Sequence, residues 1–408
     1  MAEPFHGVFV QAREEPVRPL TMASSSVIGL IGTAPDADDS AFPLDTPVLV
    51  TGNRTAAARL DTAGDGAGTL PAAIDGIFDQ IGAAVVVVRV AEGADGPDGA
   101  ETRANVIGGL DDADGYRGAH AFLAAEARLG VKPRVLCAPG FTHQRGAPGE
   151  GSDPEGPGSP GTANPVVAEL AGLAARLRAV VVADAPSTTD AEALAYAGDW
   201  GDERVFAVEP QVLVSRDGEV VAEPASARVA GLIARVDQQL GWWHSPSNKT
   251  LAGVVGTARA IDLAPGDPNA RALHLNRAGL AAIVRRDGFR LWGNRTLSGD
   301  QPGAFLSVVR SRDAIEETLA TGFLDQLDRP LTQGLIDELV ESVAAFLRGL
   351  EAQGAIRGFA VFANPELNTP QSLSTGRLYL DVSFDAVEPA ETITFRTALT
   401  NRFTEIEA

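Results

Sequence analysis

The sequence predicts an α/β (α+β) multidomain protein in which mixed-sheet domains carry flanking helices and extended N- and C-terminal arms. Three observations predict this class. Between residues 83 and 221, short β-branched runs alternate with helical patterns, which is typical of a partly parallel sheet covered by helices. The chain has 408 residues, more than one hydrophobic core usually organises. Proline-punctuated segments lie near both ends, which favours arms over packed elements.

Strand and helix patterns alternate through the first half of the chain. A short apolar strand with glycines is predicted at residues 26–33, and a β-branched run favours a second strand at 85–90. Beyond them we expect, in order, a helix at 116–129, a strand at 134–138, a helix at 165–177, a strand at 179–183, a helix at 190–197 and a strand at 205–208. The tract at 146–165 is rich in Gly, Pro and Ser, so we predict a mobile surface loop there.

A turn at Trp242 and Trp243 follows an amphipathic helix predicted at 224–239. We place a domain boundary at this turn. Four units result, namely an N-terminal arm at 1–20, an outer α/β domain at 21–240, an inner domain at 241–386 and a C-terminal arm at 387–408.

Two substantial helices are predicted in the C-terminal part, at residues 304–325 and 332–353. In the second helix, apolar residues recur at helical spacing and form a broad stripe that must be buried. Thr332 is predicted to cap the N-terminus of this helix, and Gly354 its C-terminus.

Three strand candidates follow these helices, at residues 357–362, 378–384 and 392–398. In the middle candidate, alternate apolar residues share one face. They are Leu378, Leu380, Val382 and Phe384. Pro389 separates the last candidate, which contains Ile393 and Phe395, from the one before it.

Composition excludes several functional classes. The formal net charge of −21 disfavours nucleic acid as a direct partner, because phosphate contacts need a basic surface. Cys137 is the only cysteine, which excludes a disulfide framework within the chain and fits a reducing cytoplasm. No signal-peptide pattern and no apolar run near the ~20 residues of a membrane span are present, so we expect neither secretion nor membrane insertion.

Positive charge is concentrated in one segment. Between residues 271 and 312 there are eight arginines and two aspartates, inside a strongly acidic chain. Arginine offers a planar, permanently charged fork that suits carboxylate pairs at interfaces. Lys132 and Lys249 are the only lysines, which a general preference for arginine codons explains equally well. The clustering itself indicates interaction chemistry.

Simple motifs of enzymatic chemistry are missing from the sequence, including the P-loop, HExxH and GxSxG. Cys137 and His143 lie near a predicted strand end, where a thiol nucleophile can sit, although a buried cysteine and a loop histidine are the simpler interpretation. The glycine-rich segment at 64–68 lacks the spacing of a phosphate cradle. The acidic segment at 111–115 lacks the register of a calcium loop and is interpreted as a helix-entry loop. We therefore expect no catalytic residue, cofactor or metal.

Two segments carry a family resemblance. Residues 275–300 combine an apolar run, an arginine cluster and an aromatic turn in LNRAGLAAIVRRDGFRLWGNRTLSGD, and residues 376–402 read GRLYLDVSFDAVEPAETITFRTALTNR. In this order and at this spacing they resemble contractile tail sheath proteins, such as the sheaths of P2-like bacteriophages and R-type pyocins. The resemblance extends over about 243–408, while the middle of the chain matches in general layout.

The resemblance implies a structural subunit rather than an enzyme. Such a subunit polymerises as stacked sixfold rings around an inner tail tube and contracts to drive the tube through a cell envelope. The implied partners are other copies of the chain, the tube protein, and baseplate and tail terminator proteins. The implied location is a virion tail or tailocin particle, assembled in the bacterial host cytoplasm. No nucleotide is needed, because the free energy is stored at assembly.

Strand exchange between subunits is a further implication. Apolar strand candidates near both ends carry edge groups that a soluble monomer would have to protect. The resemblance implies that each arm adds a strand to a neighbour's sheet, beside residues 378–384. The residues expected to take part are Val8, Phe9, Val10, Leu378, Leu380, Val382, Phe384, Ile393 and Phe395. Alternatively, residues 392–398 pair within their own chain as a hairpin around 387–390.

The arginine cluster then has two candidate roles. Arg310 and Arg312, on the helix predicted at 304–325, are expected to meet acidic groups of the tube. Arg285, Arg286 and Arg290 are expected to pair with adjacent subunits. Alternatively, these arginines pair with acidic residues of their own chain. Two rival classes remain, an α/β hydrolase-like enzyme that uses the middle domain and a non-contractile filament or shell protein.

Overall fold

The computed structural model describes residues 24–97, 99–111, 115–146, 163–216, 218–264, 266–267, 269–299 and 304–400. Two compact units divide the described residues. The larger comprises residues 24–313 together with 388–400, and the smaller comprises 314–387. The predicted N-terminal arm, including Val8, Phe9 and Val10, lies outside the described residues, as does most of the loop predicted at 146–165.

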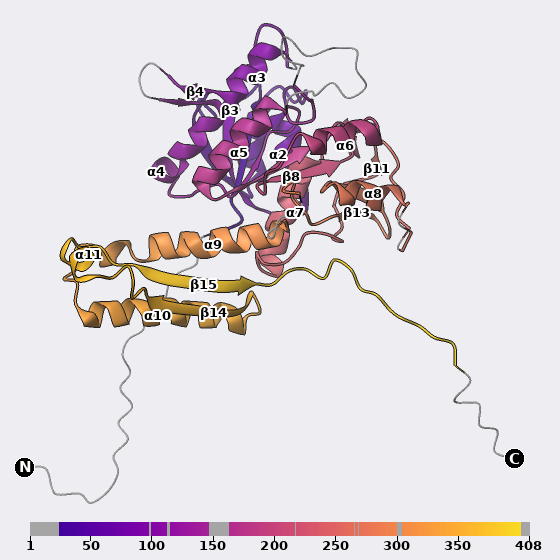
Figure 1. Ribbon diagram of the computed structural model, residues 1–408. Helices are drawn as coiled ribbons and strands as arrows, with labels where there is room; N and C mark the ends of the chain where they lie inside the picture. The colour runs from indigo at the N-terminus through magenta and orange to yellow at the C-terminus, as the bar shows by residue number, and fades with distance from the viewer. Residues whose placement is uncertain are drawn as a thin grey trace, which may run out of the picture. The chain divides into compact units, whose positions relative to one another are not determined.

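An eight-stranded sheet forms the centre of the larger unit, in the order β13-β12-β8-β7-β6-β1-β3-β2 (Figure 1). Its strands are β1 (Ile28–Thr33), β2 (Pro47–Thr51), β3 (Ala84–Val90), β6 (Val135–Cys137), β7 (Val180–Asp184), β8 (Val205–Glu209), β12 (Ala281–Arg285) and β13 (Phe289–Trp292). The inner pairs are parallel, and β2 and β13 run antiparallel at the two edges. The α/β class predicted from the alternating pattern is confirmed.

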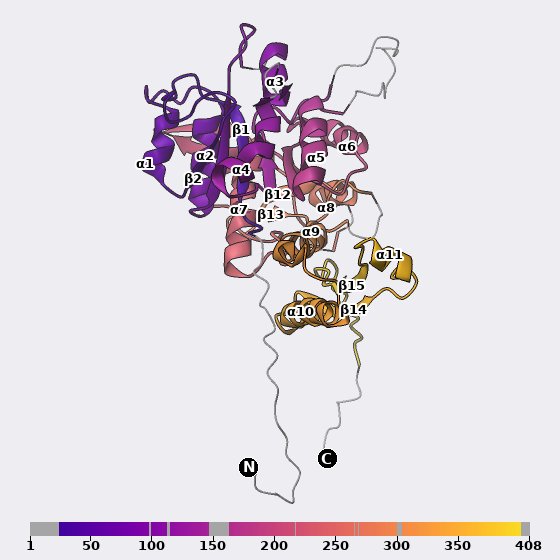
Figure 2. The same cartoon turned by 90° about the vertical axis from the view of Figure 1, so that its left-hand side faces the viewer.

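Helices cover both faces of this sheet (Figures 1 and 2). Successive strand residues point to opposite faces, so Val85 and Val87 enter one hydrophobic core while Val86 and Val88 enter the other. The first core is closed by α2 (Leu70–Gln80) and α7 (Ser226–Gln239). The second is closed by α3 (Ala100–Ile107), the 3-10 segment η2 (Gly118–Ala124), α5 (Pro165–Leu177), α6 (Asp190–Gly198) and α8 (Arg271–Arg277).

Shorter elements complete the larger unit. They are α1 (Arg54–Ala57), η1 (Ala58–Leu60), α4 (Ala125–Leu129), the hairpin of β4 (Gly109–Leu110) and β5 (Tyr116–Arg117), and a three-stranded sheet of β9 (Val212–Arg216), β10 (Glu219–Glu223) and β11 (Gly256–Thr257).

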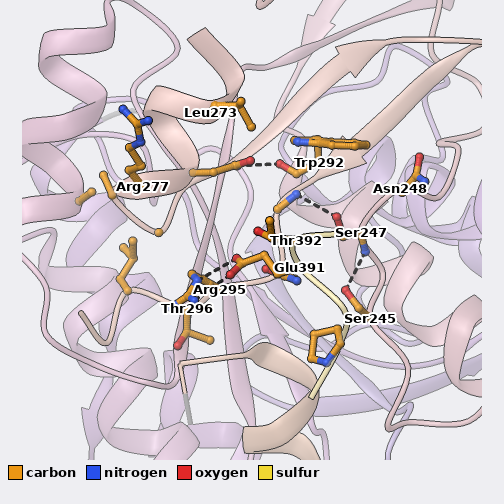
Figure 3. Close-up of a pocket in the computed structure, with 18 of the residues that line it drawn as sticks. Ser245, Ser247, Asn248, Leu273, Arg277, Trp292, Arg295, Thr296, Glu391 and Thr392 are labelled. Atoms are coloured by element: carbon orange, nitrogen blue, oxygen red, sulfur yellow. Dashed lines mark hydrogen bonds and ion pairs between the residues drawn. The ribbon is translucent and has the colours of Figure 1, made fainter. Parts of the chain in front are cut away.

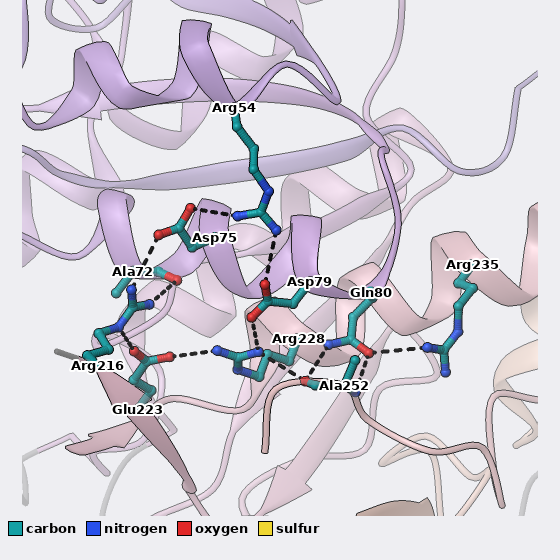
Figure 4. Close-up of polar contacts among 10 residues, drawn as sticks. All are labelled: Arg54, Ala72, Asp75, Asp79, Gln80, Arg216, Glu223, Arg228, Arg235 and Ala252. Atoms are coloured by element: carbon teal, nitrogen blue, oxygen red, sulfur yellow. Dashed lines mark hydrogen bonds and ion pairs between the residues drawn. The ribbon is translucent and has the colours of Figure 1, made fainter. Parts of the chain in front are cut away.

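An ion-pair ring ties the β9–β10 hairpin to α2 and α7 (Figure 4). Three arginines and three acids alternate around it, in the order Arg54, Asp75, Arg216, Glu223, Arg228 and Asp79. The ring runs from the surface inward, because the Arg54 side chain is half exposed while Glu223 and Arg228 are buried.

The smaller unit contains part of α9 (Leu306–Gly322), η3 (Leu324–Gln326), α10 (Gln333–Ala352), β14 (Ile356–Ala363), α11 (Pro370–Ser374) and β15 (Leu380–Ala386). The Thr332 hydroxyl accepts the backbone N–H of Leu335 and caps α10, as predicted. Gly354 ends the helix with φ of +77°, a left-handed conformation that glycine adopts without a steric cost. β14 and β15 form an antiparallel pair, and α10 packs on β14.

The helix predicted at 116–129 is wrong at its start. Residues 116–117 form β5, a 3-10 segment follows, and only Ala125–Leu129 is α-helical. Gly118 has φ of +56°, which a right-handed helix cannot contain, and its N–H bonds to the Asp45 carboxylate at 2.8 Å. Asp111 and Gly115, at the two ends of the acidic segment, lie between the paired strands β4 and β5, and Asp111 accepts the N–H of Gly115. A strand rather than the predicted helix follows Gly115.

The predicted boundary at residues 240/241 differs from the division in the structure. β12 lies beyond that boundary, yet it pairs in parallel with β8 and extends the same sheet. Ala281 lies opposite Val208, and Ala282 lies opposite Glu209. The compact units instead divide at 313/314, because the sheet continues through residues 281–292.

Candidate functional site

The C-terminal segment beyond β15 is extended and apolar. Residues 387–400 form neither helix nor strand, and Figure 1 shows them as a drawn-out trace. Ile393 is 71% exposed and Phe395 is 84% exposed, and Leu399 is fully exposed. The alternative hairpin within the chain is therefore not formed. Three large apolar side chains exposed within seven residues are typical of an interaction segment.

The root of this segment is held on the larger unit (Figure 3). Arg295 Nε and Nη2 each lie 2.8 Å from a carboxylate oxygen of Glu391. The Arg295 guanidinium also lies over the Phe305 ring, 4.7 Å from its centroid. Residues 389–392 line one side of a cavity of about 820 Å³, together with Trp200 and Trp292. The segment is thus attached through Glu391, while all residues from 390 to 400 are exposed.

The β14–β15 pair provides open strand edges in the smaller unit. Each strand pairs with the other alone among the residues that the structure describes. Leu380, Val382 and Phe384 lie in β15 as predicted and are partly buried, whereas Leu378 precedes the strand. A two-stranded sheet is marginal by itself, so additional strands would stabilise it.

The arginine cluster separates into paired and unpaired members. Four of the eight arginines form ion pairs within the larger unit, namely Arg271 with Asp190, Arg295 with Glu391, Arg310 with Asp237 and Arg312 with Glu203. The intramolecular alternative therefore holds for this half of the cluster.

Arg285, Arg286 and Arg290 lie at the β12–β13 hairpin, and none has a carboxylate partner in the described part of the chain. Arg285 and Arg286 are exposed, and the Arg285 guanidinium lies 5.9 Å from the Phe289 ring centroid. Arg290 donates to the backbone carbonyl oxygens of Arg286 and Asn248, at 2.7 and 2.9 Å. These cations remain available for acidic groups of another molecule.

Arg310 does not fit the role of a tube contact. Its side chain is 5% exposed and forms a buried ion pair with Asp237 of α7. A guanidinium buried against a carboxylate is not accessible to another protein. Arg312, two residues on, is more exposed and pairs with Glu203.

The structure does not support a thiol nucleophile at Cys137. The side chain is fully buried in β6, and burial raises the pKa of the thiol well above its usual range. The glycine-rich segment at 64–68 is equally unsuited to a phosphate, because the Asp61 carboxylate already accepts the N–H groups of Gly64 and Gly66. Within the described residues, no group of His, Cys, Asp and Glu has the arrangement of a metal site. No described helix is long and apolar enough to cross a membrane.

Sequence reasoning missed the Arg295–Glu391 pair. The two residues are 96 positions apart, and residues 314–387 of the smaller unit lie between them in the sequence. The two glutamates of the segment, Glu388 and Glu391, were the available signal, but a glutamate does not specify which arginine it meets.

Comparison with known proteins agrees with this arrangement. Residues 25–90 match the tail sheath protein Gp18 domain III N-terminal region, residues 150–297 match the phage tail sheath protein central domain, and residues 298–400 match the phage tail sheath C-terminal domain. A putative prophage major tail sheath protein of Pseudomonas aeruginosa is 38% identical over 98% of this chain and 97% of its own length. The tail sheath protein of Escherichia phage P2 is 32% identical over 99% and 97%.

Solved structures share the fold at low sequence identity. The helical sheath of the anti-feeding prophage in its contracted state has a TM-score of 0.68 and 19% identity, covering 97% of this chain and 99% of that one. The PVC sheath complex of an extracellular contractile injection system, also contracted, has a TM-score of 0.66 and 15% identity, covering 98% and 99%.

The fold and the exposed C-terminal segment define an assembly subunit. The chain belongs to the phage tail sheath protein family. It is a structural subunit of a contractile tail sheath, a component of a phage or tailocin tail, and the hydrolase-like alternative is not supported.

Proposed function

We propose that this subunit polymerises as stacked sixfold rings around an inner tail tube and contracts to drive the tube through a cell envelope. The observation that carries the proposal is the C-terminal segment, which is attached through Glu391 and exposes Ile393, Phe395 and Leu399 beyond it. A soluble monomer gains nothing from displaying these side chains, whereas a neighbouring subunit can bury them.

Strand donation is the proposed mode of contact. Residues 392–398 add to the open edge of the β14–β15 pair of a neighbour, which gains main-chain hydrogen bonds and cover for its half-buried apolar face. Val8, Phe9 and Val10 are proposed to donate a second strand from the N-terminal arm. Head-to-tail contacts that do not close on themselves generate a helical assembly, and strand linkages let subunits rotate while they stay tethered.

The free cations of the β12–β13 hairpin are proposed as a second contact. Arg285, Arg286 and Arg290 meet acidic groups of the tube or of an adjacent subunit, and the chain's own charge of −21 supplies many such groups. Arg312 is a secondary candidate because its side chain is 37% exposed. The inner and outer positions predicted for the domains stay predictions.

The remaining partners follow from the same proposal. The tube protein, baseplate proteins and tail terminator proteins bind the assembled sheath, and nucleic acid and membrane lipid do not bind it directly. The subunit acts as a structural element rather than as an enzyme and uses no nucleotide, because contraction releases free energy stored at assembly. Assembly takes place in the host cytoplasm.

Electron microscopy of the purified protein tests the proposal. We expect hollow tubes from the full chain and none from a variant that ends at Thr392, which keeps Glu391 in place. The double substitution Ile393→Asp and Phe395→Asp is expected to have the same effect without shortening the chain. A monodisperse monomer from the full chain at all concentrations would contradict strand-linked polymerisation.

A further inference from the structure

We infer that the Arg295–Glu391 pair is a positioning clamp that fixes the C-terminal arm to the eight-stranded-sheet unit and sets where the donated strand begins. The inference rests on the proposed function, because it concerns how the donated strand is presented. It goes beyond the proposed function by naming the two residues that hold the arm and the unit to which they attach it.

The Arg295–Glu391 pair lies where the chain re-enters the larger unit. The chain leaves the larger unit at residue 313, forms the smaller unit through residue 387, and then returns to the larger unit. In the returning segment, Glu391 makes a side-chain ion pair with Arg295 of the larger unit. The arm therefore starts from the larger unit, although β15 of the smaller unit precedes it in sequence.

The Arg295–Glu391 ion pair is bidentate. Both carboxylate oxygens of Glu391 are bonded, each to a different nitrogen of Arg295, at 2.8 Å. Such a two-point contact fixes orientation as well as position. Phe305 lies under the guanidinium and restricts its movement. The backbones of Arg295 and Phe305 also form an isolated antiparallel β-bridge, which positions the arginine independently of the arm.

The surroundings favour a clamp that holds and can release. The Arg295 side chain is 35% exposed and that of Glu391 is 38% exposed, so neither charge is deeply desolvated. An ion pair of this exposure contributes modestly to stability and can open without unfolding the protein. Residues 389–392 line the same cavity as Trp200 and Trp292 (Figure 3).

The consequence concerns the effective concentration of the donated strand. With the clamp closed, the tether to the donated strand starts at Glu391, and with the clamp open the tether includes more of the chain between β15 and the strand. A longer and less directed tether lowers the effective concentration of the strand at a neighbour's sheet. Breaking the clamp should therefore weaken assembly while the monomer stays folded.

A monomer experiment tests the clamp directly. Spin labels at Ala175→Cys on α5 and Thr394→Cys on the arm report their distance distribution by pulsed electron paramagnetic resonance, and both positions are exposed. Cys137 stays unlabelled because it is fully buried. We expect a narrow distribution in the parent, a broad one in Glu391→Arg, and a narrow one again in the charge swap Arg295→Glu with Glu391→Arg. A parent distribution as broad as that of Glu391→Arg would overturn the inference.

Assembly provides the second readout. We expect Glu391→Arg to raise the critical concentration for polymerisation about two- to fivefold, as befits a half-exposed ion pair, and the charge swap to return it toward the parent value. The matched control is Glu341→Arg, which breaks the exposed Arg348–Glu341 pair of α10 in the smaller unit. An equal effect of Glu341→Arg, or no recovery in the swap, would overturn the clamp.

The two proposals fail in different ways. If the full chain forms no polymer, strand-linked assembly is wrong, and the distance measurement still decides whether Arg295 holds the arm. If the full chain polymerises and the variant ending at Thr392 does not, but Glu391→Arg assembles like the parent, strand donation stands and the clamp is wrong.

Discussion

Arg310 and Asp237 form a buried ion pair between α9 and α7, with 5% and 3% of their side chains exposed. Arg310 Nη1 lies 2.8 Å from Asp237 Oδ1, and Nη2 also donates to the backbone carbonyl oxygen of Ser25 at 3.0 Å. One side chain thus joins two helices and the segment that enters β1. These contacts indicate that Arg310 acts in the packing of the subunit rather than at its surface.

The first prediction concerns that pair. Arg310→Ala leaves the Asp237 carboxylate buried without its partner, so we expect the free energy of unfolding to fall by about 3–5 kcal/mol. Arg312→Ala removes a half-exposed pair on the same helix and should cost under about 1 kcal/mol. Urea unfolding of both monomers measures the difference. Equal losses for the two variants would contradict the burial argument.

The second prediction concerns the unpaired hairpin cations. The double charge reversal Arg285→Glu and Arg286→Glu should change the free energy of unfolding by less than about 0.5 kcal/mol, because both side chains are exposed. Sheath assembly with or without tube protein should be strongly reduced, because acidic partners would then be repelled. Arg176→Glu on α5 is the control, since this arginine is also exposed and lies outside the cluster. Normal co-assembly of the double variant would remove these residues from the contact.

The third prediction uses the ion-pair ring of Figure 4. Glu223→Ala leaves the buried Arg228 with one carboxylate fewer and should lower the free energy of unfolding by about 3 kcal/mol. Arg54→Ala removes the half-exposed member of the same ring and should cost less than about 1 kcal/mol. Thermal and urea unfolding compare the two. If both variants lose the same stability, the ring acts as a unit and exposure does not set each contribution.

The fourth prediction concerns pH. Hydrogen bonds from Arg271, followed by those from Arg259, hold the pKa of Asp190 below its usual value. A carboxylate with a lowered pKa in the folded state stabilises the protein above its unfolded pKa of about 3.9 and loses this contribution as pH falls through the folded value. We expect Asp190→Asn to lower the free energy of unfolding by about 1–3 kcal/mol at pH 7.

The difference between the parent and Asp190→Asn should shrink below about pH 4, where the Asp190 carboxylate of the unfolded chain takes up a proton, and should be lost once the folded carboxylate is protonated at lower pH. Urea unfolding from pH 3 to pH 7 measures it. Glu366→Gln provides the control at an exposed glutamate and should give a small, flat difference. A difference for Asp190→Asn that is constant with pH would show that its charge is not the cause.

Local patterns in the sequence determined most of the secondary structure. The valine run of β3 could be predicted because β-branched residues favour a strand wherever they are buried. The ends of α10 could be predicted because Thr332 and Gly354 act on backbone groups of their own turns. The two segments at residues 275–300 and 376–402 also indicated the family, which the comparisons confirm.

The tertiary structure alone decided which charges meet and where the units divide. Asp237 and Arg310 are far apart in sequence, as are Arg295 and Glu391, and charge patterning does not select one carboxylate among many. The unit boundary depended on the pairing of β12 with β8, a contact between distant segments that no local propensity encodes. The exposure of Phe395 also depends on tertiary structure, because no strand pairs with its segment in the described chain. Its apolar residues predict a strand whether or not a partner strand is present. Local propensity acts over a few residues, whereas these outcomes depend on which distant surfaces the packed core brings together.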